Sequence, residues 1–409
     1  MKKIAIIGSG IAGLSCAYRL YRHYDIEIFE AAEYVGGHTH TVAVEKEDEQ
    51  AAIDTGFIVF NDRTYPNFIH LMDELGVAWQ KSEMSFSVRN DGAGLEYNGG
   101  DLNGLFAQRS NLLRPRFWRL LADITRFNRE VRREREGSND QTIGEYLQRH
   151  RYSAQFRENY LLPMISAIWS MGLDRCEDFP LSFFARFFDN HGLLDLTNRP
   201  QWYTICGGSS SYIAPLTAGF ADKIHLGSPV LRVTRSETGV EVVTAAASQL
   251  FDQVVFACHG DQALALLNSP TRQEEQVLSA FRCTDNEVIL HTDTSLLPTR
   301  QRAWASWNYR IAGRETTTLT YNMNILQRLE KKHTYLVTLN QDIDHHQVLA
   351  RFSYRHPLYT TAAIAAQEEW ATISGVDRLH FCGAYWFNGF HEDGVRSGLR
   401  VAAMLKEAR

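Results

Sequence analysis

The feature that most constrains this chain is a glycine-rich turn close to its start. Residues 8–13 read G-S-G-I-A-G, which fits the pattern G-x-G-x-x-G, and they directly follow a short apolar, β-branched run at residues 2–7. A helical pattern follows over residues 14–23, and residues 25–30 alternate in polarity as a half-buried strand does. A strand, a glycine turn, a helix and a second strand in this order predict the first unit of a doubly wound α/β sheet.

Each glycine of this turn has a physical task. Gly8 permits the tight turn after the strand, Gly10 lets the backbone approach a pyrophosphate, and Gly13 lets the helix pack closely on the strand. The start of the helix offers free N–H groups and the positive end of its dipole to phosphates. Glu30 lies 20 residues after Gly10, where a carboxylate accepts hydrogen bonds from an adenosine ribose. The acid, with no arginine beside it, disfavours a 2′-phosphate, so the motif predicts a site for NAD or FAD and not for NADP.

Size, composition and charge exclude several other classes of protein. The 409 residues correspond to roughly two or three domains. With 44% hydrophobic and 22% charged residues, the chain is not disordered, collagenous or a coiled coil. A net charge of -6 gives no support to a nucleic-acid partner. The six cysteines are scattered, without a CxxC pair or metal spacing, so we expect reduced thiols, no metal and a cytoplasmic protein.

The segment after Glu30 distinguishes between NAD and FAD. Residues 30–38 read E-A-A-E-Y-V-G-G-H. The motif E-A-x-x-x-x-G-G-x at this distance from the first glycines resembles the flavin-containing amine oxidase superfamily, which includes protoporphyrinogen oxidases and carotenoid desaturases. This resemblance implies FAD as the cofactor, with Ala31, Gly37 and His38 among its contacts. His38 stands where the family usually carries an arginine, and a histidine can also donate to phosphate or ribityl oxygens.

Further matches extend the resemblance over most of the chain. Residues 54–56 resemble the family's D-x-G turn beside the flavin, residues 229–233 the strand whose valine backbone meets the adenine, and residues 254–257 the strand that returns to the FAD domain. Residues 381–384 and 394–398 resemble the second signature, whose glycines lie by the pyrophosphate and at the start of a helix facing the flavin C2 carbonyl. The cofactor-binding residues that the resemblance implies are Gly8, Ser9, Gly10, Ile11, Ala12, Gly13, Glu30, Ala31, Gly37, His38, Thr55, Gly56, Phe57, Val230, Val233, Ala257, Gly383, Ala384, Gly394 and Val395.

The second signature is also consistent with a C-terminal helix on physical grounds. Asp393 is a suitable N-cap for a helix over about residues 394–406, and apolar residues recur along it at an approximate helical spacing. The positive end of such a helix would stabilise negative charge on a reduced flavin.

The order of these segments predicts two domains that are interleaved in the sequence. We assign residues 1–75, 216–270 and 371–409 to a Rossmann-type FAD-binding domain. Residues 76–215 and 271–370 then form an α+β substrate domain, the first of the two carrying a helical subdomain and the second rich in β-structure. The predicted fold class is therefore α/β for the cofactor domain, with an α+β domain inserted into it.

A tract dense in aromatic residues, at about 156–203, is a candidate substrate pocket. A flavin that oxidises a C–H bond needs a dry site that holds the carbon against its N5 position, and aromatic walls supply one. The simpler interpretation is that most of these rings are core residues of a helical subdomain. The residues predicted to contact substrate are Trp202 from this tract and Tyr385, Trp386 and Phe387 from the second signature. We assign no catalytic residue, because no Ser/His/Asp arrangement or general base is readable.

The region of residues 107–157 is strongly basic. It holds 12 arginines, no lysine and six carboxylates, a local balance of +6. Apolar residues recur at steps of three and four, so a helix over residues 115–136 would be amphipathic. One interpretation places this helix on an anionic membrane surface, with Phe117, Trp118 and Leu121 inserted and the protein peripheral on the inner membrane face. The other is a solvated helix that packs its apolar face inward.

Together these features predict an FAD-dependent oxidase or desaturase. No second G-x-G-x-x-G follows a strand, so we expect hydride to come from an organic substrate and not from NAD(P)H, with oxygen or a quinone as the acceptor. A small-molecule amine and a hydrophobic lipid compete as substrate. The aromatic tract, the basic helix and a resemblance to bacterial proteins linked to methylated unsaturated fatty acids favour an unsaturated or modified fatty acyl lipid. An amine or polyamine oxidase, a redox-neutral FAD-dependent isomerase and a non-catalytic FAD scaffold stay open.

Overall fold

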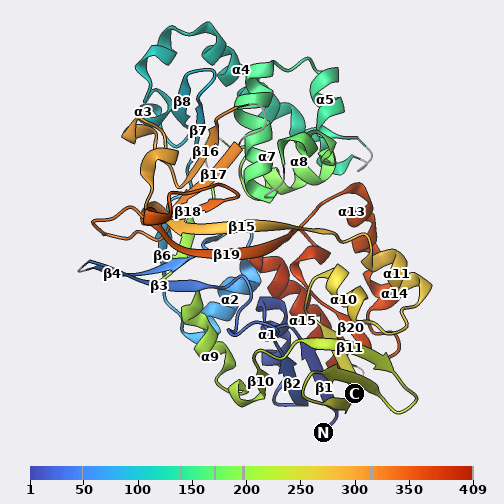
Figure 1. Cartoon of the computed structure of the whole chain (residues 1–409). Coiled ribbons are helices and arrows are strands. Elements are labelled where there is room, and N and C mark those ends of the chain that lie inside the picture. The colour runs from blue at the N-terminus through green and yellow to red at the C-terminus, as the bar shows by residue number, and fades with distance from the viewer. Residues whose placement is uncertain (48, 138–140, 170–171, 196–198, 314–316, 408–409) are drawn as a thin grey trace.

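A computed structural model of the chain describes residues 1–47, 49–137, 141–169, 172–195, 199–313 and 317–407. The molecule is elongated, with both chain ends at one pole (Figure 1). A five-stranded parallel sheet lies at this pole, in the order β10 (Ile224–His225), β2 (Asp25–Phe29), β1 (Lys3–Ile7), β14 (Gln253–Phe256) and β20 (Leu379–Phe381). Strands from the beginning, middle and end of the sequence therefore meet in one sheet, which is the predicted α/β arrangement.

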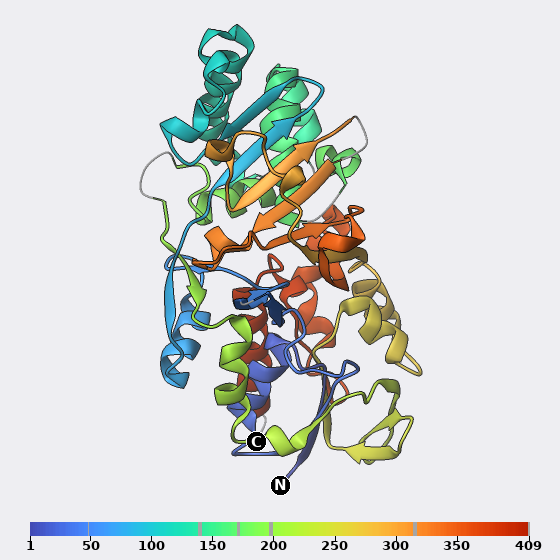
Figure 2. The ribbon, with the colours of Figure 1, turned by 60° about the vertical axis from the view of Figure 1, so that its left-hand side comes forward.

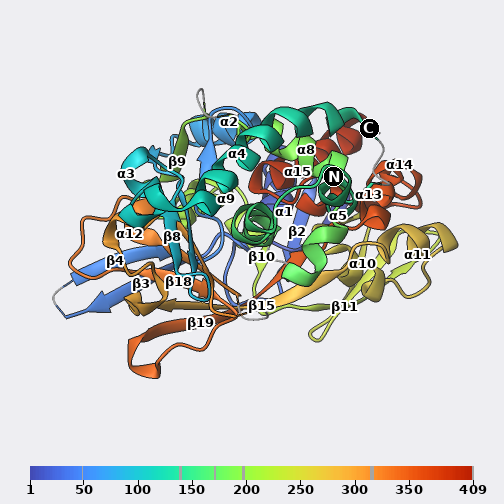
Figure 3. The same ribbon diagram turned by 90° about the horizontal axis from the view of Figure 1, so that it is seen from above.

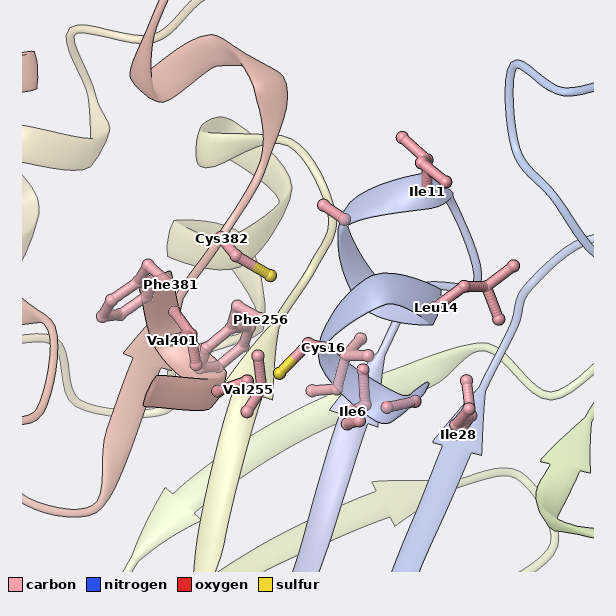
Figure 4. Packing of buried hydrophobic residues seen from close by; sticks show 14 of the residues in the cluster. Ile6, Ile11, Leu14, Cys16, Ile28, Val255, Phe256, Phe381, Cys382 and Val401 are labelled. Carbon is pink, nitrogen blue, oxygen red and sulfur yellow. The ribbon is translucent and has the colours of Figure 1, made fainter. Parts of the chain in front are cut away.

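Two helices from opposite ends of the chain pack together against this sheet. They are α1 (Ile11–Leu20) and α15 (His391–Glu407). A Cβ atom at Gly398 would collide with the carbonyl oxygen of Ala12, so glycine is needed for the two helices to approach this closely. Figure 4 shows Ile6, Cys16 and Val255 gathered in the apolar layer between α1 and the strands.

The two predicted helix limits beside the glycine motifs are wrong by about one turn. Helix α1 begins at Ile11 and not at residue 14, because the glycine turn is complete once Gly10 serves as the N-cap residue. Helix α15 begins at His391, so Asp393 lies inside its first turn and is not the N-cap. The Asp393 carboxylate accepts a hydrogen bond from the Phe390 N–H at 2.9 Å, so it caps the helix from the third position.

A seven-stranded, mostly antiparallel sheet forms the middle of the molecule. Its order is β19 (Val348–Pro357), β15 (Cys283–His291), β18 (Leu336–Leu339), β17 (Thr317–Asn322), β16 (Trp307–Ile311), β7 (Phe86–Asn90) and β8 (Leu95–Asn98). The long pair β15/β19 lies between the cofactor domain and the helices at the opposite pole (Figures 1 and 2). Five of its strands come from residues 271–370, the segment predicted to be rich in β-structure, whereas β7 and β8 come from residues 76–215.

Three small sheets and several short helices complete the two domains. The sheets are β3 (Thr41–Lys46) with β4 (Glu49–Asp54), β5 (Phe60–Asn61) with β9 (Trp202–Ile205) and β6 (Trp79–Ser82), and β11 (Val230–Arg235) with β12 (Val240–Thr244) and β13 (Ser248–Phe251). The helices include α2 (Pro66–Leu75), α9 (Ile213–Thr217), α10 (Gly260–Leu266), α11 (Arg272–Leu278), α12 (Met323–Leu326), α13 (Thr361–Glu368) and α14 (Trp370–Ile373). Figure 3 shows β3 and β4 at one side of the molecule and α10 and α11 at the other.

A helical subdomain occupies the pole opposite the chain ends. It contains α3 (Leu102–Leu105), α4 (Pro115–Glu130), α5 (Ile143–Arg149), α6 (Ala154–Phe156), α7 (Leu162–Trp169) and α8 (Leu181–Asn190). A 3-10 segment at Val131–Glu136 continues α4, so the predicted helix over 115–136 changes type at its end. Most rings of the aromatic tract are buried in the core of this subdomain, as the simpler interpretation predicted.

The apolar face of α4 packs inward. Phe117 is 2% exposed and Leu121 packs against the same core, whereas Trp118 is 49% exposed. The predicted insertion of Phe117 into a membrane is therefore wrong, because its side chain is buried in the subdomain core, and the partly buried Leu121 packs against the same core. Among the described residues, no helix has both the length and the apolar character needed to cross a bilayer.

Candidate cofactor and active site

The turn between β1 and α1 leaves an open cradle over Gly10. A Cβ atom at Gly13 would collide with the carbonyl oxygen of Gly8, and Gly8 itself has φ +111°. Gly10 differs, because its φ of -67° and ψ of 172° suit any residue, and a Cβ atom there would meet no described atom within 4 Å. Two glycines are thus required by the turn itself, while Gly10 borders space that a ligand can fill.

The start of α1 presents unpaired donors to this space. Within the described part of the chain, no side chain caps α1, and its first turn contains no acid. The first N–H groups of a helix have no partner inside it and carry the positive end of its dipole. The second glycine pair closes the cradle from the side, since Gly36 forms a bridge with Gly10 and a Cβ atom at Gly37 would lie 3.2 Å from the Gly10 Cα. These residues fit the diphosphate of a dinucleotide.

The acid at the end of β2 is held in place beside the cradle. The Glu30 carboxylate accepts hydrogen bonds from the Ser9 N–H at 2.8 Å and the Ser9 hydroxyl at 2.7 Å, and its other oxygen accepts from the Ala32 N–H at 2.9 Å. The Glu30 carbonyl also accepts from the Ser228 N–H at 2.8 Å. The segment leading to β11 is thus tied to Glu30, so the predicted adenine and ribose contacts lie on adjoining segments.

The remaining predicted adenosine-side residues occupy three different environments. Val230 and Val233 are buried in β11, whereas Ala31 is exposed at the end of β2. Ala257 follows β14, and its N–H donates to the carbonyl of Ile7 at 2.8 Å. Ala257 therefore lies at the carboxyl edge of the sheet, where ligands of doubly wound folds bind.

The two glycine signatures converge although more than 370 residues separate them. Gly394 lies against Ile11, and Gly398 lies against Ala12 and Cys16. The contact made by the later residue of α15 falls later along α1 as well. The two helices are therefore parallel, and their N-terminal ends lie at the same edge of the sheet. Two positive helix ends therefore point to one region.

The turn of the second signature is hydrogen-bonded to helix α15. The N–H of Gly383 donates to the Ser397 hydroxyl at 3.0 Å, and Gly383 has φ +156°. Ala384 begins a short 3-10 turn directly after it, and Val395 is buried in the first turns of α15. The predicted C-terminal cofactor residues are therefore grouped beside the glycine cradle.

The D-x-G turn is clasped by the segment around His38. The N–H of Phe57 donates to the His38 carbonyl at 2.7 Å, and a Cβ atom at Gly56 would collide with that carbonyl. The Thr55 hydroxyl lies 2.7 Å from the Tyr354 hydroxyl of β19. The turn thus joins the cofactor domain to the middle sheet, and Tyr354 is a neighbour that no sequence motif indicated.

Three histidine rings converge beside this turn. The centroid of His38 lies 5.4 Å from that of His356 and 6.4 Å from that of His259, and Tyr354 packs on the same ring at 5.3 Å. Burial lowers the pKa of His38 to about 3, with His356 and His259 adding to the effect, and burial lowers the pKa of His356 to about 4. An anion placed beside these rings would favour their charged forms. His259 and His356 are isolated in the sequence, so no spacing signal predicted them.

His391 opens α15 and is enclosed on several sides. Its ring stacks on Phe57 at 3.7 Å with an interplanar angle of 8°, and its Nε2 lies 2.7 Å from the Tyr212 hydroxyl. Burial lowers the pKa of His391 well below its usual value. Burial also raises the pKa of the neighbouring Asp393 to about 7 and that of Asp54 to about 6. The site therefore contains several titratable groups that are held neutral or close to neutral.

Two of the predicted substrate contacts are directed into the core. Tyr385 and Trp386 are both buried and pack on Phe281, with centroids 4.8 and 4.7 Å from its ring. Both side chains have little accessible surface, and their contact with substrate stays a prediction. Phe387 lies under the Arg396 guanidinium at 4.1 Å, and Trp202 is half-buried in β9.

Other aromatic residues connect the helical subdomain to the second signature. Phe390 stacks on Phe187 of α8 at 4.9 Å with an interplanar angle of 21°. Tyr359 stacks on Phe183 of the same helix at 5.2 Å. The buried Tyr359 hydroxyl has no hydrogen-bond partner among the described residues. The aromatic face of α8 therefore meets the loop that leads into α15, which gives the two domains an apolar junction.

Comparisons with known proteins agree with this arrangement. The sequence pattern of the family described as flavin containing amine oxidoreductase matches residues 11–323. The chain is 40% identical over 88 residues to 1-hydroxycarotenoid 3,4-desaturase of Flavobacterium sp., and the match spans 21% of this chain and 16% of the desaturase.

Two solved structures extend the likeness over the whole chain. An engineered variant of putrescine oxidase is 14% identical, with a TM-score of 0.74 over 100% of this chain and 99% of the oxidase. A CLA-producing fatty acid isomerase from P. acnes is also 14% identical, with a TM-score of 0.70 over 99% of this chain and 98% of the isomerase. At such identities the structures share the fold alone, and they confirm the predicted fold class.

Proposed function

The chain belongs to the flavin-containing amine oxidoreductase family, and from this premise we propose that it binds FAD and removes hydride from an unsaturated or modified fatty acyl chain. The observation that most supports a hydrophobic substrate is the aromatic junction of α8 with the second signature. Phe183 and Phe187 there face Tyr359 and Phe390 at stacking distances. Such rings exclude water and bind hydrocarbon through dispersion and the hydrophobic effect.

The choice of FAD over FMN is supported by the adenosine side of the site. The cradle over Gly10 is suited to a diphosphate, and Glu30 stands where a ribose would bind. FMN carries a single phosphate and no adenosine ribose, so these two features would have no role with it. We therefore infer that the flavin is the dinucleotide form.

The residues of the chain would perform three tasks around this cofactor. A bound flavin would supply the hydride-accepting chemistry. The N-terminal end of α1 would hold the diphosphate, and that of α15 would favour negative charge on the flavin. The D-x-G turn and the His38 segment, which are hydrogen-bonded to each other, would hold the cofactor where the two domains meet. The aromatic face of α8 would exclude water and orient the substrate.

A cationic amine finds less support in the same region. The Glu392 carboxylate is engaged by the Asn67 side chain at 2.6 Å and the Phe68 N–H at 2.9 Å, and Asp393 is engaged by Phe390. Lys223, a cation beside the cofactor strands, pairs with Asp25 and Glu27 on β2 at 3.4 and 3.5 Å. These charged side chains are therefore engaged in interactions within the protein. The chain shares its fold with putrescine oxidase and with the fatty acid isomerase. Amine oxidation and redox-neutral isomerisation are therefore the alternative outcomes of the test.

Anaerobic mixing of the FAD-loaded protein with candidate substrates separates the three activities. The proposal expects an unsaturated phospholipid to bleach the flavin absorbance in stoichiometric amounts and to yield a product two hydrogens lighter by mass spectrometry. An isomerase would give a product of equal mass without lasting bleaching. Bleaching by putrescine, with none by lipid, would contradict the proposal.

A pair of variants on α8 tests the aromatic junction. Phe187→Leu removes the ring that stacks on Phe390, whereas Phe184→Leu removes a ring that packs on Phe127 and Phe188 inside the subdomain. Both replace one buried phenyl ring by leucine on the same helix. We expect Phe187→Leu to raise KM for the lipid more than Phe184→Leu does. Equal effects would place the substrate away from the junction.

A further inference from the structure

We propose that the turn preceding α4 is a docking site for an anionic lipid bilayer. This inference goes beyond the proposed function and does not depend on which substrate the flavin oxidises. It concerns a protruding surface formed by α3, the 3-10 segment Arg109–Leu113 and the first turn of α4, which we call the apolar tip. The apolar tip lies at the pole opposite the two chain ends (Figure 1).

The apolar tip exposes large hydrophobic side chains close together in the sequence. Leu113 is 87% exposed, Leu102 75%, Trp118 49% and Leu112 47%. These are four of the nine large apolar residues exposed on the described surface. A cluster of such residues marks an interaction surface more often than a single one does. Trp118 is also the residue type that favours the boundary between hydrocarbon and water.

The protrusion is held rigidly from beneath. The fully buried Asn111 donates to the Glu96 carbonyl at 3.1 Å, and Phe117 is anchored in the subdomain core. The Trp118 indole N–H donates to the Leu112 carbonyl at 2.9 Å, which closes the turn. Leu112 and Leu113 therefore project outward from a fixed base, so their exposure is a property of the fold.

The charge around the tip indicates what covers it. Residues 101–119 contain four arginines and a single acid, Asp101, in a chain of net charge -6. One of these arginines, Arg119, pairs with Asp123 at 3.1 Å, so three remain without an acidic partner within this segment. The Asp101 carboxylate is occupied in accepting from the Gly104 N–H at 2.6 Å. Exposed leucines and a tryptophan with arginines close by in the sequence match the surface of an acidic bilayer, which has an apolar interior beneath anionic headgroups. A protein partner with a neutral or basic surface would not match this positive charge.

The proposed membrane contact lies at the start of the basic helix and not in its second half. Arg126 lies 3.9 Å from the ring centroid of Tyr152 and donates to the His150 carbonyl at 2.9 Å. Arg132 binds Asp189 at 2.9 Å and also pairs with Asp195. These arginines hold the subdomain together, whereas Arg109 and Arg116 are exposed beside the leucines of the tip.

Flotation of the full-length, FAD-loaded protein with vesicles tests the proposal. We expect wild type to bind vesicles of phosphatidylcholine with phosphatidylglycerol, to bind pure phosphatidylcholine weakly, and to dissociate as salt is added. Leu112→Ser combined with Leu113→Ser should weaken binding at least tenfold. The matched control is Leu231→Ser combined with Leu250→Ser, since these leucines are 56% and 51% exposed on the small sheet of the cofactor domain.

A charge variant tests whether the arginines contribute to vesicle binding. Each basic residue near an anionic surface contributes about 1 kcal/mol, so Arg109→Gln with Arg116→Gln should weaken binding at low salt by roughly thirtyfold. The apolar tip would not be a lipid site if wild type ignores anionic vesicles, or if the control pair loses as much binding as the tip pair. A concentration-dependent dimer that the tip variant dissolves, without vesicle binding by wild type, would instead assign the tip to a second copy of the chain.

Discussion

Replacing Gly10 by valine should separate cofactor binding from folding. Gly10 has backbone angles that any residue adopts, and a Cβ atom there meets no described atom within 4 Å. Valine, a β-branched residue, readily adopts such an extended conformation. A glycine replaced at a compatible position loses unfolded-state entropy, which stabilises a protein by roughly 0.4–1 kcal/mol in the case of alanine. We therefore expect the unfolding temperature of the FAD-free variant to equal or slightly exceed that of wild type.

The valine side chain would occupy the space that the diphosphate needs. The ligand would lose at least two hydrogen bonds from the backbone N–H groups at the start of α1. Hydrogen bonds to a charged group contribute roughly 1.5–3 kcal/mol each, so the loss is about 3–6 kcal/mol. This corresponds to a rise in the Kd for FAD of roughly 10²- to 10⁴-fold.

The assay pairs FAD titration of the FAD-free protein, followed by flavin fluorescence, with thermal unfolding. Gly313→Val is the matched control, because Gly313 is exposed and a Cβ atom there also meets no described atom within 4 Å. Gly398→Val is the opposite control, since its side chain would collide with Ala12 and should lower stability. Wild-type affinity in Gly10→Val would refute the assignment of the cradle. A large drop in its unfolding temperature would show that Gly10 is constrained by the fold itself.

Three further outcomes are expected. NADH and NADPH should reduce the flavin slowly in stopped-flow experiments, because no second nucleotide motif is present, and fast saturable reduction would contradict this. Burial raises the Asp393 pKa from 3.8 to about 7, so between these values the folded state keeps a proton that the unfolded state releases, and stability falls as pH rises. Asp393→Asn should therefore flatten the pH dependence of the unfolding temperature, with a gain above pH 7 of at most about 4 kcal/mol, and an unchanged slope would rule out this origin. Lys223→Gln should leave turnover within about twofold, because its exposed ion pairs with Asp25 and Glu27 contribute little to the fold; a tenfold loss of turnover would indicate a catalytic role for Lys223.

The comparison of prediction with structure is most informative where tertiary contacts overrule local patterns. Trp386 and Tyr385 lie in a cofactor motif, yet both turn toward Phe281 because the core beside β14 needs large apolar side chains. The apolar stripe of α4 is real, but it faces the subdomain core, since burying Phe117 inside the protein removes it from water as well as a membrane would. The periodicity of apolar residues predicts that one face of a helix is buried. It does not predict which surface covers that face.

The sequence by itself determined the α/β class, the glycine turn, the acid at the end of β2 and the paired C-terminal signature. Each of these depends on backbone geometry over a few residues, which glycine spacing and polarity record directly. Only the tertiary structure decided that α1 and α15 are parallel, that His38, His259 and His356 share one site, and that Leu113 stands exposed on a rigid turn. These features join segments up to several hundred residues apart, and such contacts follow from how the whole chain packs and not from any local pattern.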